Sequence, residues 1–290
     1  MTAPAPAPKA FVVGHPIAHS RSPLIHGHWL SAHGLAGSYE RLDVAPEAFA
    51  DFLSGFPASG FVGGNVTIPH KEAAFRLVAT MTPRAERIGA VNTLSLDAAG
   101  RLHGDNTDAP GFLAHLDATL GADWPETTGI GAGRTALLLG AGGAARAIAV
   151  GLLERGLPHI RIANRTAARA EALRGLDSAR VEAVAWDHVP GLLGEAGLLV
   201  NTTSLGMAGA EALDLDLAGL PDGAAVADIV YVPLETPLLA AARARSLRTV
   251  DGLGMLLHQA VPGFARWFGV TPQVTPDLRA LVVADIEGRR

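Results

Sequence analysis

The sequence ALLLGAGGAA at residues 136–145 is the stretch that decides the fold. Its apolar half has the length of a buried strand, its second half matches G-x-G-x-x-A, and residues 146–155 continue with a helical pattern. Small residues permit a tight turn and let an anion such as pyrophosphate approach the N–H groups that start the helix. This order predicts a dinucleotide-binding βαβ unit, with plain helix–sheet packing as the alternative. The predicted cradle consists of Gly140, Ala141, Gly142, Gly143 and Ala144.

The next predicted strand, 160–163, ends where an NAD-binding unit places a carboxylate about 20 residues after the glycine turn. Asn164, Arg165 and Thr166 stand there instead, and Arg169 follows one turn later. Planar guanidinium donors suit a ribose 2′-phosphate, with the Asn and Thr side chains as neutral partners. The sequence therefore predicts NADP rather than NAD as the cofactor. The alternative is a solvated helix start that carries two arginines.

Outward from this unit, short apolar strands alternate with helical stretches, which is typical of an α/β protein with mainly parallel sheets. The C-terminal series predicts a doubly wound arrangement, with strands at 136–139, 160–163, 181–184, 198–201 and 225–230. The N-terminal series predicts strands at 10–13, 39–44 and within 61–68, a helix with Ser22 as its N-cap, a helix over 48–56, and a hairpin of 91–96 with 102–106. A helix near 110–120, a loose glycine-containing stretch to 133, and a helical stripe over 253–268 complete the pattern.

Composition excludes several classes of protein. The 290 residues are 49% hydrophobic and 18% charged, enough for well-filled cores in two domains. A net charge of -5 argues against nucleic-acid binding, and no apolar run reaches membrane-spanning length. Zero cysteines exclude disulfides and thiolate sites and are compatible with a cytoplasmic location. The Pro/Ala-rich residues 1–9 lack the layout of a signal peptide, and we expect a disordered tail there.

The segment GGNVTIPHK at residues 63–71 predicts a strand end that opens onto a helix. Pro69 suits the first turn of that helix, where its missing N–H costs nothing, and Lys71 would also lie in this turn. A cation at a helix N-terminus is disfavoured by roughly 0.3–1 kcal/mol, so Lys71 calls for a functional reason. The alternative is a solvated surface lysine.

Asp108 follows the predicted hairpin and precedes a helix. Because strand ends in an α/β sheet converge on one crevice, Lys71 and Asp108 are expected to face each other. A lysine held by a carboxylate can transfer a proton to or from an oxygen, so the pair is a candidate for general acid–base chemistry. The alternative role for Asp108 is helix capping.

Ser20 and Ser22 place two hydroxyls at the predicted start of a helix, which suits a small carboxylate, with simple capping as the alternative for Ser22. Neutral hydrogen-bonding groups that suit a polyhydroxylated ligand are Asn65, Thr67, Asn92 and Gln259. Histidines cluster between 15 and 33, but none forms His-Glu-x-x-His and no cysteine assists them. We therefore expect no metal site.

Taken in order, these blocks resemble the shikimate dehydrogenase family over nearly the whole chain. The blocks are residues 14–23 (GHPIAHSRSP), 64–71 (GNVTIPHK), 89–93 (GAVNT), 106–108 (NTD), 140–145 (GAGGAA), 164–166 (NRT), 201–207 (NTTSLGM) and 254–260 (GMLLHQA). The resemblance implies reversible NADPH-dependent reduction of 3-dehydroshikimate to shikimate. It also implies two α/β domains separated by a cleft: a mainly parallel-sheet substrate domain of residues 10–110 and 253–290, and a Rossmann-type NADP domain of residues 111–252.

The resemblance also implies residue roles. Lys71 and Asp108 become the catalytic dyad, and Ser20 and Ser22 hold the substrate carboxylate. The remaining substrate-binding residues are Thr67, Asn92, Gln259 and Tyr231. The further cofactor-binding residues are Thr203, Met207, Gly252 and Met255, of which Met207 and Met255, together with Tyr231, lie near the nicotinamide.

Two alternatives remain open at this level. A quinate/shikimate dehydrogenase of broader specificity shares the dyad, and a non-catalytic NADP-binding regulator could share the fold. Both Lys71 and Asp108 are present, which disfavours the regulator, and Arg165 disfavours an NAD-dependent quinate enzyme. A homodimer is compatible with the sequence.

Overall fold

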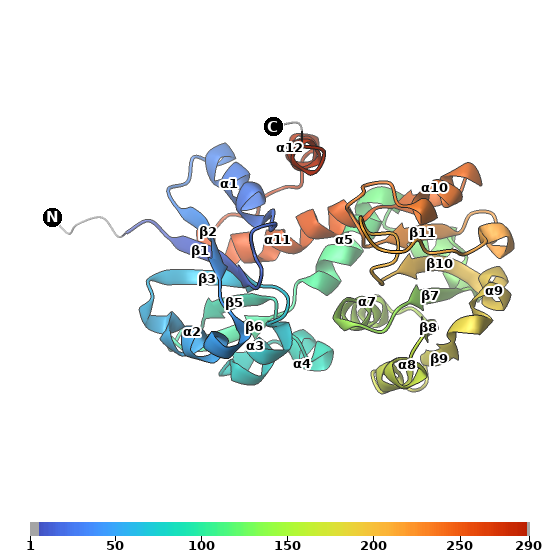
Figure 1. Ribbon diagram of the computed structural model, residues 1–290, viewed down its shortest axis with the longest axis horizontal. Helices are drawn as coiled ribbons and strands as arrows, with labels where there is room; N and C mark the ends of the chain where they lie inside the picture. Colours follow the sequence, from blue (N-terminus) through green and yellow to red (C-terminus); the bar gives the residue numbers. More distant parts are fainter. Residues whose placement is uncertain (1–5, 289–290) are drawn as a thin grey trace. The chain divides into compact units, whose positions relative to one another are not determined.

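The computed structural model describes residues 6–288, and its contacts divide the chain into two compact units (Figure 1). Unit 1 comprises Met1–Thr107 and Gln259–Arg290, and unit 2 comprises Asp108–His258. The helix that begins at Asp108 belongs entirely to unit 2. Each unit has its own sheet and its own hydrophobic core.

The sheet of unit 1 has the strand order β2-β1-β3-β5-β6-β4. Its strands are β1 (Lys9–Gly14), β2 (Ser38–Asp43), β3 (Phe61–Val66), β4 (Thr80–Met81), β5 (Thr93–Leu96) and β6 (Leu102–Asp105). The strand β5 is antiparallel to both of its neighbours, while the other pairs are parallel. The predicted hairpin and the mainly parallel sheet are therefore confirmed, and β4 is a strand that the sequence analysis missed.

Helices cover both faces of this sheet. They are α1 (Ser22–Ala32), α2 (Phe49–Gly55), α3 (Lys71–Leu77), α4 (Pro83–Ile88) and α12 (Pro276–Ile286), with short 3-10 turns η1 (Pro46–Ala48) and η2 (Phe56–Ala58). On one face, Phe11 of β1 packs edge-on against Phe52 and Phe56. On the other face, rings from α1 and from the end of α11 (Gly252–Phe268) pack together, including Trp29 and Phe264.

Several local predictions in unit 1 were wrong. Ser22 is the first residue of α1 rather than its N-cap, because Arg21 takes the cap position and its carbonyl accepts the first helical hydrogen bonds. Pro69 precedes α3, since pairing with β1 continues beyond β3 through the bond from Thr67 N–H to the Val13 carbonyl. Lys9 belongs to β1 and not to the tail, whose residues 1–5 lie outside the described part. The helix expected over 48–56 is divided into η1, α2 and η2.

The sheet of unit 2 is entirely parallel, with the order β12-β11-β10-β7-β8-β9. Its strands are β7 (Thr135–Leu139), β8 (Ile160–Asn164), β9 (Val181–Ala185), β10 (Ala196–Asn201), β11 (Ala225–Asp228) and β12 (Arg248–Val250). Numbered from β7, this is the doubly wound order 3-2-1-4-5-6, whose switch point lies between β7 and β10. The predicted arrangement is confirmed; β12 was missed, and the strand expected over 225–230 ends at Asp228.

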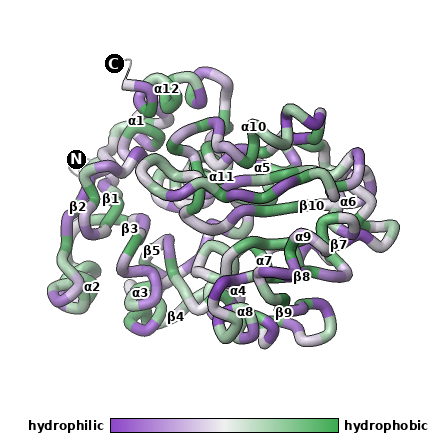
Figure 2. The backbone as a smooth tube through the Cα atoms, turned by 45° about the vertical axis from the view of Figure 1, so that its right-hand side comes forward, coloured by the Kyte–Doolittle hydropathy of each residue, from purple (hydrophilic) through white to green (hydrophobic). Residues whose placement is uncertain are grey.

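Side chains of β7 alternate between two cores. Ala136 and Leu138 join the core under α5 and α7, whereas Leu137 and Leu139 join the core under α9 and α10. All of them are fully buried, as expected for a parallel strand covered on both faces. Figure 2 shows the same hydrophobic character along β10. The helices are α5 (Asp108–Leu120), α6 (Trp124–Thr127), α7 (Gly143–Glu154), α8 (Ala167–Arg174), α9 (Val189–Leu192) and α10 (Pro237–Ala244), with 3-10 turns η3 (Ile130–Ala132), η4 (Trp186–His188), η5 (Leu193–Glu195) and η6 (Leu217–Gly219).

The helix α11 has residues in both units, with the division between His258 and Gln259, and it contains Pro262 in its interior. No helix within residues 6–288 is both long enough and apolar enough to cross a membrane.

Candidate active site

A pair of hydroxyl groups lies at the start of α1. The Oγ atoms of Ser20 and Ser22 are 3.3 Å apart, and the Ser22 N–H lies 3.4 Å from the Ser20 hydroxyl that accepts from it. Arg41 holds this segment, because its guanidinium donates twice to the Ser20 carbonyl, at 2.9 and 2.7 Å. Two adjacent hydroxyls with a cation beside them are suitable partners for a small carboxylate.

A buried polar network continues from this pair along the sheet. The Ser22 side chain lies near the phenol of Tyr39, and Tyr39 donates to Asn65 Oδ1 at 2.6 Å. The Asn65 amide donates to the Asn92 carbonyl at 3.1 Å and to the Thr93 hydroxyl at 3.3 Å. These hydrogen bonds hold the buried carboxamide of Asn65 in one orientation.

Asn92 is fixed by three hydrogen bonds to its Oδ1 atom. The donors are the Thr93 hydroxyl at 2.8 Å, the Thr107 N–H at 2.9 Å and the Thr107 hydroxyl at 3.2 Å. The side chain therefore directs its acceptor into the protein and keeps Nδ2 as its donor group.

Lys71 is the first residue of α3, in the first turn as predicted. The preceding His70 is buried; its Nε2 donates to the Val44 carbonyl at 2.6 Å and its ring stacks on Phe49 at 4.2 Å between centroids. The Lys71 carbonyl accepts from the Val91 N–H at 3.0 Å. These contacts fix the backbone from which the lysine side chain extends.

Asp108 is the first residue of α5 and directly follows Thr107. Val91 donates its N–H to the Lys71 carbonyl, and the Asn92 side chain accepts from the N–H of Thr107, the residue before Asp108. Lys71 belongs to unit 1 and Asp108 to unit 2. A carboxylate in the first turn of a helix is favoured by the helix dipole.

Two further predicted substrate residues lie in unit 1. Thr67 donates its N–H to the Val13 carbonyl at 2.9 Å, and its methyl packs so closely on Gly14 that a Cβ there would lie 2.6 Å away. Gln259 lies in α11 as the first residue of the second segment of unit 1. Tyr231 belongs to unit 2 and follows β11.

In unit 2, a cavity of about 210 Å³ lies at the carboxyl ends of β7, β8 and β10. This is the switch point of the sheet, where ligands of doubly wound folds bind. Six predicted cofactor residues line it: Gly140, Ala141, Gly142, Asn164, Arg165 and Thr203. The others do not line it: Gly143, Ala144, Thr166, Arg169, Met207, Gly252 and Met255. The lining residues that sequence reasoning missed are Trp186, Thr202, Ser204 and Leu205.

The glycine turn has the conformation that an approaching anion needs. Gly140 has φ +107°, and a Cβ there would lie 2.6 Å from Thr202 Oγ1, so only glycine fits. Gly142 is the N-cap of α7 and makes no side-chain cap bond, and a Cβ at this position would meet no atom within 4 Å. The N–H groups at the start of α7 therefore lie beside open space, as an anion site requires.

Arg165 is exposed at the rim of this cavity, and Asn164 fixes the turn by donating to the Thr166 carbonyl at 3.0 Å. Within the described residues, neither Arg165 nor Arg169 forms an ion pair with a carboxylate. Their charge is not neutralised by a neighbouring acid.

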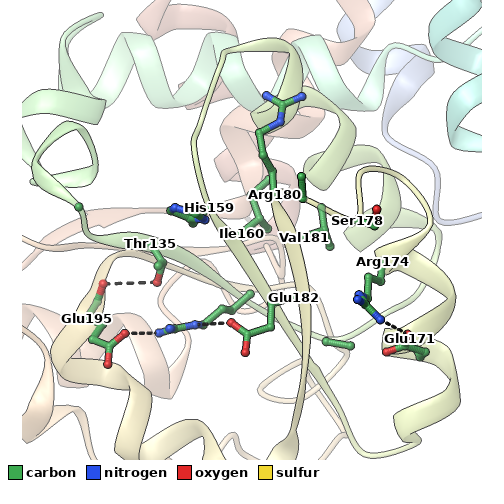
Figure 3. A pocket seen from close by; sticks show the side chains of 14 residues that line it. Thr135, His159, Ile160, Glu171, Arg174, Ser178, Arg180, Val181, Glu182 and Glu195 are labelled. Carbon is green, nitrogen blue, oxygen red and sulfur yellow. Dashed lines mark hydrogen bonds and ion pairs between the residues drawn. The ribbon is translucent and has the colours of Figure 1, made fainter.

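A larger cavity of about 510 Å³ lies at the opposite, amino ends of the same strands (Figure 3). Its arginines are neutralised: Arg161 pairs with Glu182 at 2.9 Å and Glu195 at 2.5 Å, and Arg174 pairs with Glu171 at 3.1 Å. The smaller cavity is the better anion site, because charge and position in the fold count for more than volume.

A buried aspartate organises the loops beside the smaller cavity. Asp228 accepts from Asn201 Nδ2 at 3.0 Å, from the Val230 N–H at 3.0 Å and from the Thr236 hydroxyl at 2.7 Å. Asn201 in turn accepts from the N–H and the hydroxyl of Thr203, at 3.0 and 2.7 Å. Burial raises the pKa of Asp228 above its ordinary value, against these donors. The network holds the loop that carries Thr203 to the end of β11.

The remaining predicted cofactor residues of unit 2 lie near these loops in the chain. Gly252 begins α11 and touches the Ile229 carbonyl, where a Cβ would lie 2.3 Å away. Met255 packs against the core under α7, and Met207 is 45% exposed. No group of three or more histidines, cysteines or carboxylates among residues 6–288 is arranged to hold a metal ion.

Comparison with known proteins matches these sites to one family. The profile described as "Shikimate dehydrogenase substrate binding domain" matches residues 12–94, "Shikimate / quinate 5-dehydrogenase" matches 127–208, and "Shikimate 5'-dehydrogenase C-terminal domain" matches 252–282. A protein of Methylobacterium radiotolerans named shikimate dehydrogenase (NADP(+)) is 68% identical over 281 residues, which cover 97% of this chain and 98% of that protein. The chain belongs to the shikimate dehydrogenase family.

Solved structures of shikimate dehydrogenase relatives agree with this. The enzyme of Thermus thermophilus in complex with NADP(H) and shikimate has a TM-score of 0.80 and 39% identity, covering 96% of this chain and 99% of that one. The quinate dehydrogenase of Corynebacterium glutamicum in complex with NAD has a TM-score of 0.86 and 31% identity, covering 97% and 100%. The fold predicted from the sequence is confirmed.

Proposed function

We propose that this chain catalyses the reversible NADP-dependent interconversion of 3-dehydroshikimate and shikimate. The proposal rests on two features found in one chain of this family. The first is the crevice of unit 2 that Arg165 lines, where this arginine has no ion pair within residues 6–288. The second is the hydroxyl pair of unit 1 with the buried hydrogen bond between Tyr39 and Asn65. We assign NADP to residues 111–252 and the substrate to residues 10–110 and 253–290.

NADP fits the crevice of unit 2. The glycine turn and the start of α7 offer N–H groups to a pyrophosphate, and Asn164 and Arg165 replace the carboxylate that would select an unphosphorylated ribose. Arg169 and Thr166 follow on the same helix start and extend this 2′-phosphate site. When bound, NADP supplies the hydride chemistry of the reaction.

The side chains of unit 1 suit the substrate. Ser20 and Ser22 would donate to the carboxylate, and the Nδ2 donor of Asn92 would bind a ring hydroxyl together with Thr67 and Gln259. A cyclic polyol with one carboxylate needs donors whose positions are fixed, and the hydrogen bonds to Asn92 Oδ1 fix one of them.

Proton transfer is assigned to the dyad. In the direction of reduction, Lys71 gives its proton to the carbonyl oxygen that becomes the alcohol, and in oxidation it takes that proton back. Asp108 orients the ammonium group toward this oxygen. Backbone contacts of Lys71 and Thr107 to residues 91–92 support this arrangement.

A spectrophotometric assay of NADP reduction tests the function. We expect turnover with shikimate and NADP, and much slower reaction with NAD or with quinate. A quinate/shikimate dehydrogenase is the second candidate, favoured by the similarity to the quinate dehydrogenase structure. Comparable kcat/KM values for quinate and shikimate would establish that candidate instead. If neither acid reacts, the remaining hypothesis is a non-catalytic NADP-binding regulator.

Replacement of Lys71 by alanine tests the dyad. Because general acid–base groups contribute about 10²- to 10⁴-fold to rate, we expect kcat to fall by at least about 100-fold with little change in shikimate affinity. The chain contains only one other lysine, Lys9, which is exposed at the start of β1 and serves as the matched control. Turnover of Lys71→Ala equal to that of Lys9→Ala would remove Lys71 from the mechanism. The cytoplasmic location and the homodimer stay predictions.

A further inference from the structure

Two aromatic rings are stacked in the core of unit 1, close to the hydroxyl pair of Ser20 and Ser22. His26 of α1 and Tyr39 of β2 are parallel, with 3.9 Å between ring centroids and 3° between planes. Both are buried, at 0% and 9% exposure, and Trp29, Phe264 and Trp267 surround the histidine. The phenol of Tyr39 therefore has a fixed position in the core of unit 1.

His26 acts in this stack as a neutral ring. Neither of its nitrogens makes a hydrogen bond within the described residues, and burial lowers its pKa to about 3, an effect that the nearby Asn65 partly opposes. No charge is available here for catalysis. The imidazole supports the face of Tyr39 and leaves the phenol oxygen as the only polar atom of the pair with partners.

The phenol has a single proton and lies close to two polar side chains, those of Asn65 and Ser22. Tyr39 donates that proton to Asn65 Oδ1 at 2.6 Å, so toward Ser22 the phenol oxygen can only accept. Burial raises the pKa of Tyr39 well above its ordinary value, so the phenol keeps its proton. The phenol oxygen therefore offers the nearby Ser22 hydroxyl an acceptor, and an anionic acceptor such as a carboxylate would compete for the same proton.

We propose that Tyr39 is a positioning residue for substrate binding, which sets the Ser22 hydroxyl for the carboxylate and holds Asn65, and through it Asn92, for the ring hydroxyls. This inference rests on the proposed function. Tyr39 touches neither substrate nor cofactor in this proposal; it connects two groups that do. Its loss would affect substrate binding more than the chemical step.

Kinetics of Tyr39→Phe, Ser22→Ala and the double variant test the proposal, because phenylalanine keeps the ring stack and removes only the hydroxyl. Loss of one well-placed hydrogen bond typically costs about 10-fold in binding. For Tyr39→Phe we expect KM for shikimate to rise about 10-fold, kcat to fall less than about 3-fold, and KM for NADP to stay constant. In the Ser22→Ala background, the same change should raise KM by clearly less than 10-fold, because only the contribution through Asn65 remains. The matched control is Thr128→Val, which removes a buried hydroxyl of unit 2 that donates to the Trp124 carbonyl and touches no proposed site.

Three outcomes would overturn the inference: an unchanged KM for shikimate, a parallel rise in KM for NADP, or a full 10-fold effect in the Ser22→Ala background. Calorimetric titration of shikimate into native protein and Tyr39→Phe separates this inference from the proposed function. A native protein that binds shikimate without turnover contradicts the function, while a 10-fold weaker Kd of the variant still supports Tyr39.

A second measurement needs no change at position 39. The chain has two tyrosines, Tyr39 and Tyr231, so incorporation of 3-fluorotyrosine gives two fluorine resonances, assigned with Tyr231→Phe. Shikimate should shift the Tyr39 resonance in the native protein, and Ser22→Ala should abolish most of that shift. A Tyr39 resonance insensitive to shikimate contradicts the proposal.

Discussion

At the scale of single residues, Arg165 is the group that we propose selects NADP over NAD. It lines the crevice at the switch point and has no carboxylate partner among the described residues. The arginines of the larger cavity, such as Arg174, are neutralised by carboxylates. A free guanidinium can form two parallel hydrogen bonds to a phosphate, which a neutralised one cannot do without losing its partner.

Replacement of Arg165 by alanine should therefore weaken NADP selectively. A charge-assisted hydrogen bond contributes about 1.5–3 kcal/mol, so we expect KM for NADP to rise roughly 10- to 100-fold while KM for NAD and for shikimate change little. Steady-state kinetics with both cofactors measure this. Arg174→Ala, an arginine-to-alanine change in the other cavity, should leave all three constants unchanged, and a preference for NADP retained in Arg165→Ala would contradict the assignment.

Residues with unusual chemistry for their position could be predicted from the sequence, and residues that resemble core could not. Lys71 at a helix start and the pair Ser20 and Ser22 attract notice because their position or spacing is informative without a partner. Tyr39 lies in a strand, where an aromatic residue is the ordinary choice. Its role depends on Asn65, 26 positions away, which only the folded chain brings within 2.6 Å.

At the scale of elements, the antiparallel strand β5 explains how Asn92 joins the network. Because β5 runs opposite to β3 and β6, its first residue, Thr93, pairs with Asn65 and Asp105 near the carboxyl ends of those strands. Ligands of parallel sheets bind at the carboxyl ends of the strands, so the residues expected in a site are those that follow a strand. Asn92 instead precedes one. Strand direction follows from tertiary packing, and a single sequence predicts it only where a tight turn sets it.

The loops that follow β10 and β11 depend on one buried carboxylate. Asp228→Ala should leave Asn201 and Thr236 without their acceptor, so we expect the free energy of unfolding to fall by about 2–4 kcal/mol and KM for NADP to rise several-fold as Thr203 loosens. Urea unfolding and cofactor kinetics measure the two effects.

Asp228→Asn is the matched control, because its oxygen can still accept and the Thr236 hydroxyl can reverse its role. Since burial already raises the pKa of Asp228, loss of the charge itself should cost little, and stability should stay within about 1 kcal/mol of the native value. Equal destabilisation by both changes would show that the charge, and not the hydrogen-bond geometry, stabilises the loops.

At the scale of the whole molecule, the sequence predicted unit 2 more completely than unit 1. The regular succession of strand and helix fixes a doubly wound order, since right-handed crossovers leave few alternatives. Unit 1 mixes parallel and antiparallel pairs, and the two-residue strand β4 is too short for any periodicity. Its order places β5 between β3 and β6, an arrangement that depends on long-range pairing and not on local pattern.

The pH dependence of stability should also be dominated by one residue of unit 1. The pKa of His26 is about 3 in the folded chain and near 6.5 in the unfolded chain. Protonation of His26 therefore favours the unfolded chain. For each pH unit between these two values, the free energy of unfolding changes by roughly 1.4 kcal/mol. The contribution of His26 to this free energy is at its maximum above about pH 6.5 and is lost progressively as the pH falls toward 3.

Substitution of His26 by phenylalanine keeps an aromatic ring on Tyr39 and removes the titration. We expect its acid unfolding midpoint, followed by circular dichroism, to lie at least about half a pH unit below that of the native protein. His28→Phe, at a half-buried position of the same helix, should leave the midpoint unchanged. A native midpoint shared by both variants would show that other groups control acid unfolding.

One property of α11 has a mechanical consequence. Pro262 has no N–H, so the carbonyl of His258 lacks the helical bond that residue 262 would otherwise donate. His258 is also the last residue of unit 2, and Gln259 is the first residue of the chain's return to unit 1. The helix therefore lacks one backbone hydrogen bond in the turn that contains the last residue of unit 2 and the first residue of the return to unit 1, and proline positions are where helices commonly bend.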